Sequence, residues 1–169
     1  MVRGAGVILA AVLLASPVSA QLEVGIRVGS PAPAVVLPDL DGRPVDLGTV
    51  LGKKPVLVEF WATWCSICMG LHPQLEEIRR TYGDRLEMFG VHVNVNASKP
   101  RIRRYLDQHR PPFRVLFDET GAGVRAFDVL TTSVVVIVDS AGRVAYAGSG
   151  EKQDLLGAVA RVFGARTGP

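Results

Sequence analysis

Cys65 and Cys68 are the two cysteines of this 169-residue chain, and two residues separate them. They follow an apolar run at 56–60 and precede a helical pattern at 69–82, so they lie where a buried strand turns into a helix. The thiolate is the nucleophilic form of cysteine, and a helix N-terminus lowers a thiol pKa below its ordinary value of roughly 8.5. The pattern predicts that Cys65 attacks a disulfide and that the deeper Cys68 resolves the mixed disulfide.

Two other uses of the cysteine pair suit this spacing less well. An inert disulfide stabilises a fold least when it closes so short a loop. A zinc site needs two further ligands, and the chain has no other cysteine to supply them. The spacing therefore favours redox or soft-metal chemistry.

The run Trp61-Ala-Thr-Trp-Cys-Ser-Ile-Cys68 resembles the active site of thioredoxin-like proteins. It is most similar to the exported TlpA/ResA/CcmG group of thiol–disulfide reductases, whose typical run is Phe-Trp-Ala-Thr-Trp-Cys-x-x-Cys. Pro73, five residues after the second cysteine, adds to the resemblance, which extends over about residues 28–163. The resemblance implies a protein disulfide reductase whose redox centre is the cysteine pair itself, with no other cofactor.

The apolar patterns support an α/β, thioredoxin-like fold with a central mixed β-sheet flanked by helices. Short apolar runs on either side of Asp39-Leu-Asp-Gly42 predict a β-hairpin, which resembles the N-terminal extension of the exported group. The order of elements also matches the central β-α insertion of that group. Further strands are predicted at 87–95, 114–117, 134–138 and 143–147, and further helices near 98–108, 123–127 and 153–163. The last helix is expected to turn inward the side chains of Leu155, Leu156, Val159 and Val162.

The first twenty residues read as a cleaved signal peptide, which leaves 21–169 as a single thioredoxin-like domain. Arg3, an apolar run at 7–15 and the small residues Val18-Ser19-Ala20 form this pattern. The alternative is an uncleaved anchor, but the apolar run is shorter than the ~20 residues that span a bilayer. We expect a soluble, exported, periplasmic protein, and the resemblance implies a membrane electron donor of the DsbD type. The net charge of +3 gives no argument for nucleic acid, and a monomer is expected.

Glu59 interrupts the apolar strand six residues before Cys65. Residues 57, 59 and 61 share one face of that strand, so burial of the carboxyl group beneath a helix is expected, with a raised pKa. The position is where thioredoxins carry a buried Asp, and the resemblance implies that Glu59 accepts and donates a proton for Cys68. The alternative is a glutamate turned to solvent at the strand edge.

Three residues are expected around the cysteine pair. Trp64 is predicted to cover apolar surface beside the disulfide, whereas Trp61 is predicted to pack in the core. Thr132 and Ser133 fall where the resembled group carries a residue followed by a cis proline, and this chain has no proline there. A cis bond before a non-proline residue costs roughly 2.5–4 kcal/mol, so the loop is either trans or strained. The Ser133 N–H is expected to be available, and its hydroxyl to reach a Cys65 thiolate.

The alternative function is a periplasmic copper-binding protein. Cys65, Cys68, Met69 and His72 would supply soft or borderline ligands for Cu(I), although local packing of Met69, with His72 as a core or surface residue before the kink expected at Pro73, is the favoured explanation of these two residues. A peroxiredoxin is disfavoured because its Pro-x-x-x-Thr-x-x-Cys loop is missing. The leading hypothesis is a reductase of disulfide-bearing client proteins, of the cytochrome c or copper-site maturation type.

Overall fold

The structure is a computed structural model, and it describes residues 24–164. The predicted signal peptide at 1–20 lies outside the described residues. Within them, no helix combines the length and the apolar character needed to cross a membrane.

A mixed five-stranded sheet forms the centre of the fold, in the order β5-β4-β3-β6-β7. β3, β4 and β5 are parallel, whereas β6 is antiparallel to β3 and β7 is antiparallel to β6. These strands span Val56–Trp61 (β3), Glu87–Val93 (β4), Arg114–Asp118 (β5), Val134–Val138 (β6) and Val144–Gly148 (β7). All side chains of β3 and β6 are buried, as expected of strands covered on both faces.

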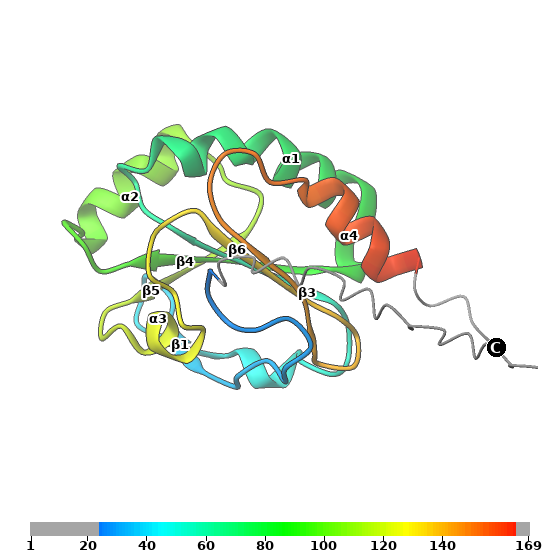
Figure 1. Ribbon diagram of the computed structural model, residues 1–169. Coiled ribbons are helices and arrows are strands. Elements are labelled where there is room, and N and C mark those ends of the chain that lie inside the picture. The colour runs from blue at the N-terminus through cyan, green and yellow to red at the C-terminus, as the bar shows by residue number, and fades with distance from the viewer. Residues whose placement is uncertain (1–23, 165–169) are drawn as a thin grey trace, which may run out of the picture.

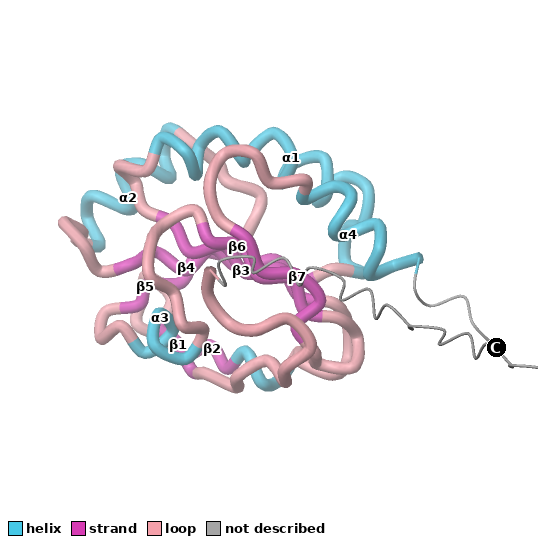
Figure 2. The backbone as a smooth tube through the Cα atoms, in the orientation of Figure 1, coloured by secondary structure: helices cyan, strands magenta, loops and turns pink. Residues whose placement is uncertain are grey.

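Helices and a hairpin cover the two faces of the sheet. Figure 1 shows α1, α2 and α4 on one face, with α3 and the hairpin strand β1 on the other, and Figure 2 shows the strands lying between them. The helices span Ser66–Tyr82 (α1), Lys99–Gln108 (α2), Ala122–Ala126 (α3) and Leu155–Gly164 (α4). The hairpin pairs β1 (Val36–Pro38) with β2 (Pro44–Asp46), and a bridge from Asp39 to Leu116 ties it to β5. The predicted thioredoxin-like architecture, with its hairpin and insertion, is confirmed.

The helix ends follow from local sequence. Ser98 caps α2 by accepting a hydrogen bond from the Arg101 N–H, with Pro100 in the first turn. Gly83, at a φ of 52°, ends α1. The prediction for α4 was wrong in one position, because Leu156 is 39% exposed. The buried stripe runs through Leu155, Ala158, Val159 and Val162, which is the helical spacing, and Leu156 lies about 100° away from Leu155 around the axis.

Candidate active site

The cysteine pair lies at the start of α1, directly after the central strand β3. Cys65 is the N-cap residue of the helix, and its Sγ accepts a hydrogen bond from the backbone N–H of Cys68 at 3.1 Å. The two cysteines form a disulfide. Cys65 is 5% exposed and Cys68 is fully buried, so an incoming reactant reaches Cys65 first. A thiolate at Cys65 would receive the same N–H donor and the positive end of the helix dipole.

Glu59 lies inside the fold on β3. The side chain is fully buried, and neither carboxylate oxygen has a hydrogen-bond partner among the described residues. Burial raises the pKa of Glu59 to about 8, because no charge or donor compensates the carboxylate for lost water. The expected burial and direction of the pKa shift are therefore found. A carboxyl group that titrates near neutral pH is suited to accept and return a proton.

Trp64 is fixed to the segment that follows β4. Its indole N–H donates to the backbone oxygen of Val95 at 2.9 Å, and the side chain remains 49% exposed. Trp61 is fully buried and packs against Tyr105 and Phe113, with ring centroids 5.4 and 5.6 Å away, so its predicted place in the core is found.

The structure of the loop that ends at Ser133 contradicts the expectation that the Ser133 N–H is available. The described chain has no cis peptide bond, and Ser133 adopts a left-handed φ of 63°. Its N–H is not available, because it donates to the Phe60 carbonyl at 2.8 Å. Its hydroxyl accepts from the N–H of Gly150 at 3.1 Å, and its carbonyl accepts from the Gln153 amide at 2.9 Å. Ser133 thus joins the end of β3 to the β7–α4 loop, and the neighbouring Thr132 is half-buried.

Met69 and His72 lie on α1 after the cysteine pair. Met69 is 37% exposed, whereas the half-buried His72 ring packs edge-on against Phe113 at 5.9 Å. Among residues 24–164, no group of three or more His, Cys, Asp or Glu side chains is placed to hold a metal ion. His72 therefore does not join the two cysteines in such a group, and burial lowers its pKa.

The sequence did not reveal the role of His92. This fully buried residue accepts a hydrogen bond at Nε2 from the backbone N–H of Thr63, at 3.0 Å, two residues before Cys65. It pairs in register with Trp61 on the adjacent strand, and the two rings meet edge-on at 5.0 Å. The available signal was a histidine that interrupts the apolar run at 88–93 of β4.

This arrangement of a Cys-x-x-Cys pair, a buried acid and a mixed sheet defines a thioredoxin-like thiol–disulfide oxidoreductase. Residues 27–161 match the family model Redoxin, and this range is well over half of the chain. The chain belongs to the redoxin family.

Three relatives place the chain more narrowly. It is 33% identical over 121 residues to thioredoxin-like protein YneN of Bacillus subtilis, covering 71% of this chain and 70% of that protein. It is 26% identical over 133 residues to thiol-disulfide oxidoreductase ResA of Bacillus thuringiensis, covering 77% of this chain and 74% of that protein. A crystal structure assigned as thiol:disulfide interchange protein DsbE of Chlorobium tepidum superposes with a TM-score of 0.71 at 25% identity. The match covers 85% of this chain and 99% of that one. These relatives support the TlpA/ResA/CcmG group.

Proposed function

We propose that this protein is exported to the periplasm and reduces disulfides in client proteins, with Cys65 as the nucleophile. The main support is the position of Cys65, which is the more exposed residue of the pair and caps α1 at its N-terminus. The side chains of Trp64 and Ile67, on either side of Cys65, are about half exposed, and such apolar surface suits contact with a protein client.

The proposed reaction has two thiol–disulfide exchanges. The Cys65 thiolate attacks one sulfur of the client disulfide, which forms a mixed disulfide and releases the other client sulfur as a thiolate. Glu59 in its ionised form, which is the minor form at pH 7 because its pKa is about 8, then takes the proton of Cys68, and the Cys68 thiolate attacks the Cys65 sulfur. The second client sulfur leaves, and the protein retains the Cys65–Cys68 disulfide. Two electrons pass to the client, and a membrane thiol-transfer donor of the DsbD type would restore the dithiol.

The redox centre in this proposal is the cysteine pair itself, without a bound cofactor, in a monomeric protein. The proposed clients are proteins matured for cytochrome c assembly or for copper sites. The leader-like sequence at 1–20 supports export. Sequencing the N-terminus of the protein recovered from a periplasmic fraction tests its export and the cleavage of the leader. Light scattering tests the oligomeric state.

The activity is tested with the dithiol protein and an intramolecular disulfide peptide. We expect stoichiometric reduction by the wild type, loss of reaction in Cys65→Ser, and accumulation of a mixed disulfide in Cys68→Ser. A reduction potential near or below that of thioredoxin, about −270 mV, is expected of a dedicated reductase. A potential far above that value would overturn the assignment as a reductase in favour of an oxidant or isomerase.

A further inference from the structure

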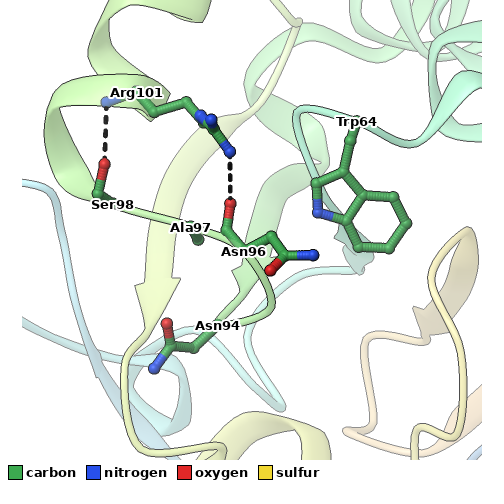
Figure 3. A pocket seen from close by; sticks show the side chains of 6 residues that line it. All are labelled: Trp64, Asn94, Asn96, Ala97, Ser98 and Arg101. Atoms are coloured by element: carbon green, nitrogen blue, oxygen red, sulfur yellow. Dashed lines mark hydrogen bonds between the residues drawn. The ribbon is translucent and has the colours of Figure 1, made fainter.

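A hollow of about 510 Å³ opens beside Trp64, the residue that precedes the attacking cysteine. Figure 3 shows the indole ring on one side of this hollow and the Arg101 side chain on the other, with the Asn96 side chain between them. The hollow is lined by Trp64, Asn94, Asn96, Ala97, Ser98 and Arg101.

The walls of the hollow are held by hydrogen bonds before any client arrives. The Trp64 indole N–H donates a hydrogen bond to the Val95 carbonyl, and the Arg101 guanidinium donates one to the Asn96 carbonyl at 2.9 Å. The Asn94 amide donates to the Glu119 carbonyl at 2.7 Å. Asn96 itself has a φ of 50°, a conformation that Asn tolerates better than most residues. The hollow is therefore a preorganised feature of the β4–α2 segment.

Its charge is positive and uncompensated. None of the six lining residues is acidic, and Arg101 has no carboxylate within ion-pair distance in the described part of the chain. Its neighbours on α2 differ, because Lys99 pairs with Glu119 and Arg103 pairs with Asp41. Arg101 uses one nitrogen for the Asn96 carbonyl, so other guanidinium donors remain for a carboxylate.

We propose that this hollow binds an acidic side chain of the client, an Asp or Glu within a few residues of the cysteine that Cys65 attacks. The inference rests on the proposed reductase function and adds a partner chemistry to it. Arg101 would hold the carboxylate, the Asn94 and Asn96 amides would offer further donors, and Trp64 would contact the adjoining chain. Because Trp64 is bonded directly to Cys65 along the backbone, the bound residue must lie near the client disulfide.

Matched peptides test the proposal. The two peptides carry the same intramolecular disulfide, with Glu in one and Gln in the other beside the reactive cysteine. We expect the dithiol form of the wild type to reduce the Glu peptide with a second-order rate constant about tenfold larger at low ionic strength, since a charge-assisted hydrogen bond is worth about this much. The preference should shrink as salt is added.

Variants of α2 supply the controls. Arg101→Gln should reduce both peptides at the same rate, and Arg101→Glu should favour a peptide with Lys at that position. Arg104 is an exposed arginine of the same helix that does not line the hollow, so Arg104→Gln should keep the tenfold preference. Equal rates for the Glu and Gln peptides with the wild type would overturn the docking proposal and leave the reductase function standing.

A binding measurement separates the two proposals if neither peptide is reduced. The chain has two tryptophans, and the Trp64 indole proton can be followed by NMR in the oxidised protein. Peptides with Ser in place of both cysteines are titrated, and the Glu peptide alone should shift this resonance, with the shift lost in Arg101→Gln. Equal or absent shifts for the two peptides would overturn the docking site independently of any activity.

Discussion

The backbone N–H of Thr63 donates a hydrogen bond to Nε2 of His92, at 3.0 Å. Because Nε2 accepts, the ring carries its proton on Nδ1, which donates to the Val93 carbonyl at 2.8 Å. Burial lowers the pKa of His92, and this neutral tautomer is the one the hydrogen bonds require. A side chain of β4 thus fixes the backbone of the loop that presents Cys65.

Replacing His92 should loosen this loop. His92→Phe keeps an aromatic ring against Trp61 but leaves the Thr63 N–H without an acceptor, which should cost about 1–3 kcal/mol of unfolding free energy. Denaturant unfolding of the oxidised protein measures this change. As a positioning residue, His92 should also alter the reduction potential of the cysteine pair when replaced. His109→Phe, at an exposed histidine, is the control, and an unchanged potential in His92→Phe would contradict the positioning role.

Acid should weaken the wild type through the same hydrogen bond. The folded pKa of His92 lies below its unfolded value of about 6.5, so the folded state binds fewer protons. Its contribution is fully present above pH 6.5 and is lost as pH falls through the folded pKa. The difference in unfolding free energy between wild type and His92→Phe should therefore narrow below pH 6.5. A constant difference from pH 8 to pH 5 would show that His92 titrates normally.

Glu59 should make the unfolding free energy depend on pH with the opposite sign, so that stability falls as pH rises. Its folded pKa of about 8 lies above the unfolded value of 4.5, so the folded state retains a proton that the unfolded chain releases. The stabilising contribution is present below pH 4.5 and is lost as pH rises towards 8, with a slope on the order of 1.4 kcal/mol per pH unit. Glu59→Gln should abolish this slope in urea unfolding of the oxidised protein and be more stable than the wild type at pH 8.

The same variant tests the proton transfer. If Glu59 accepts the Cys68 proton, Glu59→Gln should slow release of the client from the mixed disulfide and leave the first attack by Cys65 nearly unchanged. Stopped-flow measurement of the two phases separates these steps. A first phase slowed as much as the second would instead indicate a general structural effect of the substitution.

The features that sequence analysis predicted are those fixed by neighbours along the chain. Cys65 caps α1 through a bond to Cys68, three residues away, and this geometry follows from the helix start. The burial of Glu59 follows from strand alternation and cover on both faces. Short-range patterns of this kind carry their own structural information.

The missed features depend on partners distant in sequence. His92 meets Thr63 across 29 residues, and Ser133 bonds Phe60 across the β3–β6 pairing. Trp64 was expected to cover apolar surface beside the disulfide; its hydrogen bond to Val95, which the sequence did not indicate, depends on how the β4–α2 segment returns to the active site. No local pattern specifies these contacts, because each depends on the register of two strands or the course of a loop.

Gly90 should tolerate no side chain while Phe113 is present. A Cβ added to Gly90 on β4 would overlap the Phe113 ring, which itself packs against Trp61 and His72. Gly90→Ala should therefore destabilise the fold by about 1–3 kcal/mol through overpacking. Phe113→Leu removes part of the obstructing ring, so the double variant should lose less than the sum of the two single losses. Additive losses in denaturant unfolding would show that the ring moves aside freely.

Ser133 should reject the proline that the resembled group carries at this place. Proline fixes φ near −65° and has no N–H, whereas Ser133 holds a φ of 63° and donates to Phe60. Ser133→Pro should lower the unfolding free energy by about 3 kcal/mol or more.

Ser133→Gly is the matched control for that substitution. Glycine keeps the N–H hydrogen bond to the Phe60 carbonyl. Its ease at positive φ should raise the unfolding free energy by about 1 kcal/mol, and loss of the hydroxyl hydrogen bond to Gly150 should lower it by about as much. Its stability should therefore lie within about 1 kcal/mol of the wild type, well above that of Ser133→Pro. Equal stabilities for the two variants would mean that the left-handed backbone conformation of Ser133 is not required for folding. They would also mean that the hydrogen bonds of Ser133 to Phe60 and Gly150 contribute little to holding β6 beside the active site.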